Sequence, residues 1–535
     1  MLDRRHWFST VAHGVLLAGG PGWLNASTIA LATDSASPLG TFNVKTYGAV
    51  GDGTTIDTAA INRAIEAAAA AGGGTVYFPS GTFPSYSIHL KSHVSLYLEQ
   101  GATILAAATP LEGTLTGGYD AAEPQGAWEP YQDHGHNHWH NSLLWGENIH
   151  DFSITGPGLI WGKGLSRGHD DDKDLPDTKQ PGVGNKAIAL KNCYNVILRD
   201  FSILNGGWFG ILATGVDNFT IDNLKIDTNR DGIDIDCCRS VRVSNCTVNS
   251  PYDDGICPKS SFALGYARPT ENVTITNCFL TGGYEVGSLL DGTWKLIPLP
   301  RRLRSTGRIK FGTESNGGFR NITVSNCVFE HSRGFALESV DGALCEDVTI
   351  VGITMRGNTT GPLFLRLGAR MRGPKDAQIG TMRRILISTI TSYDAVLLPS
   401  ILSGIPGHYI EDVKISDVYL HQVGGADAAM AKTQPPEKEQ AYPEPTMFGD
   451  LPATGFFVRH AKNLEMSNVE IATAAPDSRP VFTMIDVDGA DLFRVRVPKA
   501  ANEPVFALKQ VSNFRVFGSP FVPDKHVLHA DNEAF

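Results

Sequence analysis

The sequence lacks three features that would place it in a familiar class of protein. Beyond residue 32 it has no uninterrupted apolar run of about 18 residues, the length that a transmembrane helix needs, which predicts a mature chain without membrane spans. No stretch is basic enough to follow a phosphate backbone, and the formal net charge is -11, so we expect no nucleic-acid partner. No two cysteines have CxxC spacing, which argues against a thiolate zinc site.

Charged residues are also scarce, at 19% of the chain, whereas glycine (57) and proline (30) are frequent. This composition is typical of a turn-rich, well-buried β protein and not of a disordered one. A length of 535 residues is long for one compact domain but ordinary for a solenoid of stacked repeats.

The first 32 residues have the pattern of an export signal. Arg4 and Arg5 precede a stretch of modest apolarity, and Ala30-Leu31-Ala32 supplies small residues at a cleavage position. The arginine pair resembles a twin-arginine signal, and an ordinary secretory signal is the alternative. We therefore expect residues 33–535 to form the mature protein, exported to the periplasm or the exterior.

A strand-like pattern recurs from residue 194 onwards. Its runs alternate β-branched with polar residues and carry Asn or Asp near the turns: YNVILRDFSI, DNFTIDNLKI, SVRVSNCTV, ENVTITNCFL, RNITVSNCVF, EDVTIVGITM, EDVKISDVYL and KNLEMSNVEI. The first three start at residues 194, 217 and 240, which are 23 residues apart, and the later gaps are longer. The period indicates one structural repeat per run, with loops inserted between some of them.

Stacked parallel strands explain this pattern best. No segment of helical period separates the runs, which excludes βαβ units, and the runs lack the hairpin signals of a β-sandwich. We predict an all-β fold, a single right-handed parallel β-helix from about residue 41 to the C-terminus. The less regular stretches 107–185 and 427–446 are expected to be inserted loops within that one domain.

An Ala-rich segment from Asp57 to about Ala71 predicts one helix ahead of the strands. Asp57 is expected to cap it with its side chain, and Gly72-Gly73-Gly74 would end it. A single helix at this place suits a cap over the open end of the stack, where apolar core and strand edges would otherwise be exposed.

The eight cysteines are interpreted as small buried apolar residues. Cys246, Cys278 and Cys327 each follow an Asn inside a strand-like run, which indicates equivalent inward positions in successive coils. A disulfide framework is the alternative, because export would permit one.

Two acidic clusters lie one repeat apart in the segment 229–260. Asp231 stands in NRDG, and Asp253 and Asp254 are adjacent, with the run VRVSNCTV between the clusters. In a stack of coils this spacing places one cluster above the other. Glycoside hydrolysis needs one protonated carboxyl and one carboxylate, and acids held close together keep one proton bound at higher pH. Each acid alone could be a turn or cap residue, but three acids one coil apart favour catalysis.

Two polar segments fall within the first expected insertion. HGHNHWH (134–140) could bind a metal, but its spacing matches no strong zinc signature, so we interpret it as a loop that borders the active site, with Trp139 as a platform for a sugar ring. HDDDKD (169–174) could bind Ca²⁺, although a solvated loop is the simpler interpretation.

The acidic segment, NRDGIDIDCCRSV followed by DDGICPKS, resembles glycoside hydrolase family 28, the polygalacturonase family, whose members carry N-T-D-G and then D-D-C one coil later. The opening FNVKTYGAVGDGTT and the stretch GTESNGGFRNITVSNCVF are also similar to bacterial members. The resemblance covers about residues 41–420. It implies a parallel β-helix, an inverting hydrolase without a cofactor, and a pectic polysaccharide or oligosaccharide as substrate.

The resemblance also implies roles for single residues. Asp253 would be the general acid, and Asp231 and Asp254 would activate the attacking water. Lys259 would contact the sugar, and Asn229 fills the Asn of the motif, whereas Arg230 replaces its usual Thr.

Departures from the family pattern bear on the substrate. The G-H-G segment of homogalacturonan-cutting members is absent, and Arg308-Ile309-Lys310 stands before GTESNGG, where the family's R-I-K is not expected. The preferred alignment places that motif on RGFALES (333–339), so that Ala336 and Glu338 replace the clamp for a substrate carboxylate. Glu338 would then repel a uronate, unless Arg308 and Lys310 supply compensating charge. Rhamnogalacturonan, a substituted pectin or a neutral sugar is thus favoured over plain galacturonan.

Two other functions stay open on sequence alone. A polysaccharide lyase could use the same β-helix, and a non-catalytic β-helix could bind carbohydrate. We expect a monomer that acts on a pectic polymer or oligomer, with exo action as one option.

Overall fold

The computed structural model describes residues 40–109, 118–167, 176–497 and 503–535. The chain divides into two units, residues 1–39 and residues 40–535, and only the second is described. The expected export signal and the acidic run HDDDKD therefore lie outside the described residues.

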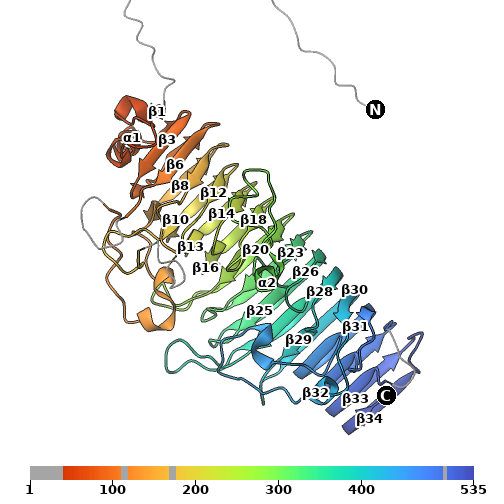
Figure 1. The fold of residues 1–535 in the computed structure, drawn as a ribbon. Helices are drawn as coiled ribbons and strands as arrows, with labels where there is room; N and C mark the ends of the chain where they lie inside the picture. Colours follow the sequence, from red (N-terminus) through yellow and green to blue (C-terminus); the bar gives the residue numbers. More distant parts are fainter. Residues whose placement is uncertain (1–39, 110–117, 168–175, 498–502) are drawn as a thin grey trace, which may run out of the picture. The chain divides into compact units, whose positions relative to one another are not determined.

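Residues 40–535 form coils of parallel strands, each coil hydrogen-bonded to the next (Figure 1). The strands make one 28-stranded sheet and one six-stranded sheet. The prediction of a single right-handed parallel β-helix is confirmed.

One column of strands in the large sheet runs through the whole stack: β1 (Thr41–Asn43), β2 (Gly74–Phe78), β5 (Val94–Leu98), β8 (His150–Thr155), β11 (Tyr194–Arg199), β14 (Asp217–Asp222), β17 (Arg239–Ser244), β20 (Thr270–Thr276), β23 (Phe319–Ser325), β26 (Leu344–Arg356), β28 (Thr381–Ala395), β30 (Ile410–Gly424), β31 (Phe456–Ala475), β32 (Phe482–Phe493) and β33 (Phe506–Phe517). A second column joins it at β26: β3 (Gly81–Ser85), β6 (Ala102–Ala106), β9 (Leu159–Trp161), β12 (Ser202–Leu204), β15 (Lys225–Asp227), β18 (Thr247–Asn249), β21 (Phe279–Thr281) and β24 (Val328–Glu330).

The six-stranded sheet forms the remaining wall of the early coils: β4 (Ile88–His89), β7 (Leu144–Glu147), β10 (Lys186–Lys191), β13 (Phe209–Thr214), β16 (Asp231–Asp236) and β19 (Ile256–Lys259). The same wall continues in the later coils through an isolated bridge between Ile256 and Ile309. Its later strands are β22 (Lys310–Phe311), β25 (Phe335–Ser339), β27 (Leu363–Leu367) and β29 (Ser400–Ser403). This wall carries the acidic clusters.

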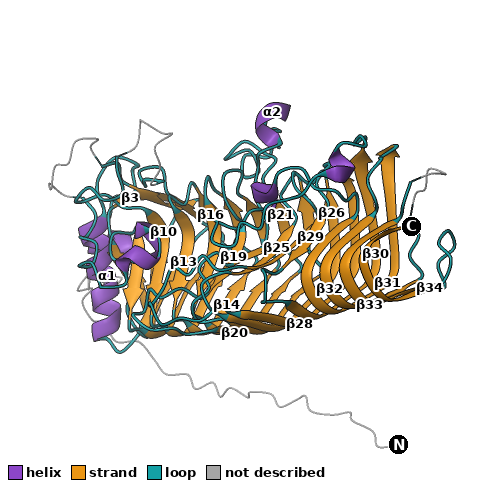
Figure 2. Cartoon of the chain, turned by 90° about the horizontal axis from the view of Figure 1, so that it is seen from below, coloured by secondary structure: helices purple, strands orange, loops and turns teal. Residues whose placement is uncertain are grey.

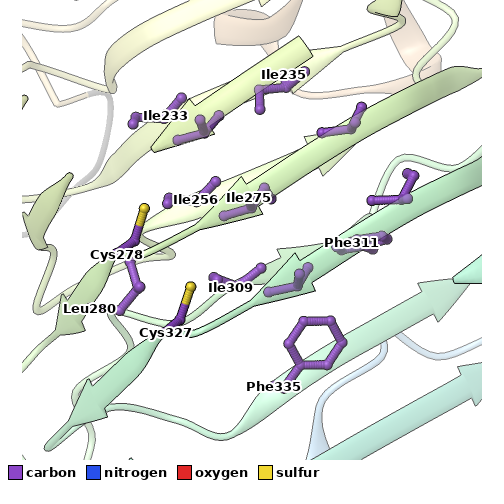
Figure 3. Close-up of a cluster of buried hydrophobic side chains, with 14 of the residues drawn as sticks. Ile233, Ile235, Ile256, Ile275, Cys278, Leu280, Ile309, Phe311, Cys327 and Phe335 are labelled. Atoms are coloured by element: carbon purple, nitrogen blue, oxygen red, sulfur yellow. The ribbon is translucent and has the colours of Figure 1, made fainter. Parts of the chain in front are cut away.

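The core lies inside the coils, where inward residues of successive strands stack. Figure 3 shows Ile233, Ile256 and Ile309 from successive coils of the wall, in the same core as Cys278 and Cys327. Because strand residues alternate between the two faces, placing Ile233 and Ile235 inward directs Asp234 and Asp236 outward. The register of the two acidic clusters follows from the pairing of Ile233 with Ile256 in neighbouring coils.

Asparagines turn the corners between strands. Asn245, Asn277 and Asn326 all have φ between 54° and 57°, a left-handed conformation that Asn tolerates better than most residues. The cysteine after each of them points into the core, as the SNC and TNC repeats predict. All eight cysteines are free and buried, which confirms the interpretation as buried thiols.

Both ends of the stack are covered. Helix α1 (Thr58–Ala70) packs at the first coils, as expected (Figure 2). Asp57 is its N-cap residue, but its side chain makes no capping bond. The carboxylate accepts hydrogen bonds from the backbone N–H of Val50 (2.7 Å) and Gly51 (3.0 Å) instead. At the other end β34 (Lys525–Ala534) pairs antiparallel with β33 and covers its edge.

The inserted segments differ partly from expectation. The stretch 107–185 contains a complete coil, β7 to β9, whereas residues 425–455 form a loop between β30 and β31 that includes the expected insertion 427–446. A further loop, between β21 and β22, carries the short helix α2 (Leu299–Arg302). The 3-10 helices are η1 (Val44–Tyr47), η2 (Glu129–Tyr131), η3 (His134–His136), η4 (Met430–Lys432) and η5 (Pro445–Phe448). None of the helices in the described part of the chain is both long and apolar enough to span a membrane.

Candidate active site

Asp231 and Asp254 occupy equivalent positions in neighbouring coils. Asp231 is the first residue of β16, and the register that pairs Ile233 with Ile256 places Asp254 opposite Asp231. The backbone N–H of Asp254 donates to Asp231 Oδ1 at 3.2 Å, and carboxylate oxygens of the two residues lie within 4.8 Å. The 23-residue spacing therefore brings the two acidic clusters together, as predicted.

Asp253 is paired with Arg230. The Nη2 and Nε atoms of Arg230 lie 2.8 and 3.1 Å from Asp253 Oδ2, and the guanidinium stacks 4.8 Å from the Trp208 ring centroid. Burial would raise the pKa of Asp253, but the Arg230 charge outweighs it, and the pKa lies below its usual value. At 25% side-chain exposure, Asp253 is the most accessible of the three acids.

Asp254 is held by the two cations of the Arg308-Ile309-Lys310 segment. Lys310 Nζ lies 2.6 Å from Asp254 Oδ2, and Arg308 Nε donates to Oδ1 at 2.8 Å. Burial opposes ionisation, but Lys310 and then Arg308 hold the pKa of Asp254 well below its usual range. Both cations are buried, so water screens their attraction for Asp254 only weakly.

Asp231 has the opposite electrostatic environment. Burial, and then the neighbouring Asp253 carboxylate, raise the pKa of Asp231 well above its usual value. Lys259 is the nearest cation, with Nζ 3.8 Å from Asp231 Oδ2, but it lies closer to Glu314 (3.3 Å) and Asp234 (3.7 Å). The three acids thus differ: Asp231 tends to hold a proton, and Asp253 and Asp254 tend to be ionised.

Glu338 lies beside this cluster but does not face solvent. It is 0% exposed, its Oε1 lies 4.0 Å from Arg308 Nη2, and burial raises the pKa of Glu338 to about 8. Glu338 belongs to β25, one coil beyond β22, in the register that pairs Lys310 with Ala336. The expectation that Glu338 repels a uronate is therefore corrected, because a buried, protonated carboxyl neither repels nor contacts a polymer directly.

Two more of the expected substrate-binding residues, Asn229 and Trp139, are also buried. Asn229 is 7% exposed, and in the amide orientation that satisfies both its ends it donates to Gly207 O (3.2 Å) and accepts from Arg167 Nε (3.1 Å). Trp139 is 2% exposed, donates from Nε1 to Thr214 Oγ1 (3.1 Å), and has Lys191 Nζ 4.3 Å from its ring centroid. The ring of Trp139 is therefore not presented as a platform.

Loops bring residues to the site that the sequence did not single out. Glu444, in the loop 425–455, accepts from Arg308 Nη2 (3.0 Å) and lies 2.7 Å from Arg333 Nη1. Tyr442 of the same loop is 52% exposed, and its hydroxyl accepts from Lys310 Nζ at 3.4 Å. The loop thus contacts the two cations beside Asp254, although it lies far along the chain from them. The strand repeat in the sequence does not predict this contact.

A second set of residues that the sequence did not single out surrounds Lys259. His136 Nε2 lies 3.7 Å from Asp234 Oδ2 and 3.8 Å from Glu314 Oε2, and all three side chains are buried. Lys259, His136 and Arg370 together hold the pKa of Glu314 well below its usual value, against the effect of its burial. His136 belongs to the segment HGHNHWH, which the sequence predicts to border the site, and it is the residue that places this segment beside Asp234 and Glu314.

Several groups of His, Cys, Asp and Glu side chains near the site could together bind a metal ion. They are His136 with Asp231 and Asp234, Asp231 with Asp254 and Cys257, Glu123 with His140 and Glu147, and Glu129 with His134 and His138. In the first three a lysine already lies within 4 Å of a carboxylate, namely Lys259, Lys310 and Lys191.

Two protein-family models match parts of the chain. Residues 41–143 match the model described as rhamnogalacturonase A/epimerase, pectate lyase-like, and residues 161–296 match a right-handed β-helix region. Together they support a pectinase-like β-helix.

Two proteins are similar to this chain in sequence. A probable polygalacturonase from Vitis vinifera is 24% identical over 58% of this chain and 60% of its own length. Plasmin and fibronectin-binding protein A from Streptococcus pneumoniae is 30% identical over 46% of this chain and 32% of its own length. The chain therefore spans less than two thirds of either relative.

A solved structure supports the fold in the same way. The family 28 exopolygalacturonase of Yersinia enterocolitica superposes with a TM-score of 0.58 and 17% identity, over 84% of this chain and 78% of its own. At this identity the likeness concerns the fold alone.

Proposed function

We propose that this protein is a glycoside hydrolase that cleaves pectic polysaccharide or its oligomers, with Asp231, Asp253 and Asp254 as the catalytic carboxylates. The observation that carries the proposal is that the stacked acids differ in pKa: the pKa of Asp231 is raised, and those of Asp253 and Asp254 are lowered. Neighbouring carboxyl groups whose pKa values are pushed apart are the means by which one site supplies both acid and base. The polygalacturonase relative and the resemblance to family 28 support the substrate class.

The geometry suggests how the proton moves. Asp231 holds it in the resting site and hydrogen-bonds to Asp253, which lowers the pKa of Asp253 further. Asp253 is the exposed acid: it takes this proton from Asp231 and passes it to the leaving glycosidic oxygen as the glycosidic bond breaks, which leaves both carboxylates ionised. Water adds to the anomeric carbon beside Asp254, which stays ionised and orients it, and the proton of the water returns to Asp231. One bond to oxygen breaks, one forms, and the site recovers its proton.

The charge balance bears on the sugar that the site accepts. Each described Lys or Arg at the acids is already paired with a protein carboxylate: Arg230 with Asp253, Lys310 with Asp254, Arg308 with Asp254 and Glu444, Arg333 with Glu444, and Lys259 with Glu314. A substrate carboxylate would have to displace one of these partners. We propose a neutral or substituted residue at the cleavage point, as in rhamnogalacturonan or esterified pectin.

As part of the same proposal the loop 425–455 favours exo action, because Tyr442 and Glu444 contact Lys310 and Arg308 beside Asp254 and would limit access of a polymer there. The fold and relatives are also compatible with an exported protein, which we retain as a proposal.

Product analysis on a panel of pectic polymers tests the function. New reducing ends without ultraviolet absorbance, on rhamnogalacturonan or esterified pectin, are the expected result. Absorbance would identify unsaturated products and a lyase. The streptococcal binding-protein relative makes a non-catalytic function the second candidate. That function predicts polymer binding without any product, and equal binding by wild type and Asp253→Asn.

A further inference from the structure

Glu129, His134 and His138 converge in the segment that borders the active site. Glu129 lies in η2 and His134 in η3, two short turns of one loop. Glu129 Oε1 lies 3.3 Å from His134 Nδ1, and Glu129 Oε2 lies 3.8 Å from His138 Nε2. The ligand atoms of all three residues lie within 4.8 Å of one another. Their side chains are only 17%, 11% and 2% exposed.

The hydrogen bonding of His138 prepares it as a ligand. Its Nδ1–H donates to the backbone carbonyl of His134 at 2.8 Å, which leaves the lone pair on Nε2. That lone pair faces a carboxylate oxygen of Glu129, so two acceptor atoms confront each other at 3.8 Å. A cation between them resolves the conflict.

The neighbouring clusters already contain such a cation, and this one does not. Lys191 Nζ lies 2.9 Å from Glu147 in the cluster with His140. Lys259 Nζ lies 3.8 Å from Asp231, and Lys310 Nζ lies 2.6 Å from Asp254. Among the described residues, no Lys or Arg nitrogen lies within 4.0 Å of Glu129. Among the described groups, that of His93, His150 and Asp151 also has no Lys or Arg nitrogen within 4.0 Å, but it is more exposed, so the Glu129 cluster is the better enclosed of the two.

We propose that Glu129, His134 and His138 bind a divalent transition-metal ion, with zinc as the best match. Two imidazole nitrogens and one carboxylate oxygen suit Zn²⁺. A tetrahedral ion about 2.0–2.1 Å from each ligand separates the ligand atoms by about 3.4 Å, close to the separations found here. Water would complete the coordination.

The ion would tie η2 to η3 and to His138. His136 lies between the two histidine ligands in sequence, and its imidazole reaches Asp234 and Glu314 beside the catalytic acids. Metal binding would thus fix the position of His136. The role is structural, and the binding itself does not depend on the proposed reaction.

Isothermal titration of the untagged, chelator-stripped full chain with ZnCl₂ tests the site. We expect one ion per chain and a higher Tm with zinc, because an ion that binds only the folded state stabilises it. Glu129→Gln and His138→Gln should each weaken binding by at least about tenfold. His140→Gln and His150→Gln, in neighbouring His-carboxylate groups, are the matched controls and should bind like wild type.

Absence of stoichiometric binding would overturn the proposal, and so would wild-type affinity in both ligand variants. Co²⁺ substitution gives an independent readout, since a tetrahedral N/O site yields visible absorption bands that Glu129→Gln should alter. Far-UV circular dichroism of each variant keeps misfolding separate from loss of a ligand.

Discussion

Arg230 and Asp253 form an ion pair across neighbouring coils, with Nη2 2.8 Å from Oδ2. The arginine stands where the family 28 motif has a threonine, and it contacts the acid to which the resemblance gives proton donation. The pair lowers the pKa of Asp253 and moves the resting proton towards Asp231. In the proposed reaction, the residue at this position of the motif would therefore set which acid holds the proton.

Replacing Arg230 with Thr should shift the pH dependence of turnover. Removing the cation raises the pKa of Asp253, because a positive charge next to a carboxyl stabilises its ionised form. The alkaline limb of the kcat/KM profile, where the acid loses its proton, should move to higher pH. Arg304→Thr, at an exposed arginine in the loop after α2, should leave the profile unchanged. A limb that stays in place in Arg230→Thr would argue against Asp253 as the final donor.

Asp253→Asn should abolish turnover, by roughly a thousandfold or more, because an amide cannot deliver a proton. Its Tm should remain near that of wild type, since Asp253 and Arg230 are both partly exposed and such pairs contribute little to stability. The measurement is reducing-end release together with a thermal melt. Asp450→Asn, at an exposed aspartate, is the control. Normal turnover in Asp253→Asn would reject the catalytic assignment.

Glu338→Gln should become more stable relative to wild type as pH rises. Burial raises the pKa of Glu338 to about 8 in the folded protein, against about 4.3 in an unfolded chain. Between these values the folded state binds a proton that the unfolded state lacks, so wild-type stability falls with rising pH by at most about 1.4 kcal/mol per pH unit from this group. The amide introduced by Glu338→Gln cannot ionise, so the variant escapes this loss.

Denaturant unfolding at pH 5 and pH 8 measures the Glu338 effect. The stability difference between Glu338→Gln and wild type should move in favour of the variant at pH 8. Glu439→Gln, at an exposed glutamate, should show no such change. A difference that is equal at both pH values would mean that Glu338 is ionised in the folded protein.

Glu444→Gln should improve binding of acidic oligomers. The Glu444 carboxylate occupies Arg308 and Arg333, and a neutral amide of the same shape leaves more positive charge for a uronate. KM for galacturonate oligomers should fall several-fold, while KM for their methyl esters stays the same. Glu439→Gln in the same loop serves as the control. An equal change for both substrates would point to altered loop position, without a role in charge recognition.

All eight cysteines should titrate as free thiols in denaturant without reductant. In the native protein we expect almost no reaction, because the thiols are buried and burial raises the pKa of Cys193 to about 11. The measurement is a thiol count with a chromogenic disulfide reagent. A count of six or fewer would reveal a disulfide.

The sequence by itself determined the fold and the meeting of Asp231 with Asp254. A strand must place Ile233 and Ile256 inward, the coils repeat at 23 residues, and the two constraints together leave one register. The Asn-Cys repeats mark the corners for the same reason, since the left-handed turn and the inward thiol recur once per coil.

Only the tertiary structure decided which charges surround the acids. Arg308 and Lys310 turn towards Asp254 from the coil beyond a long loop, and Glu444 arrives from 136 positions beyond Arg308 in the chain. Glu129 likewise joins His134 and His138 through the path of an irregular loop, and Trp139 of that segment is buried against Phe209 and Leu212 of the wall. Coil periodicity constrains the strands, whereas an inserted loop has no period, so its contacts depend on packing alone.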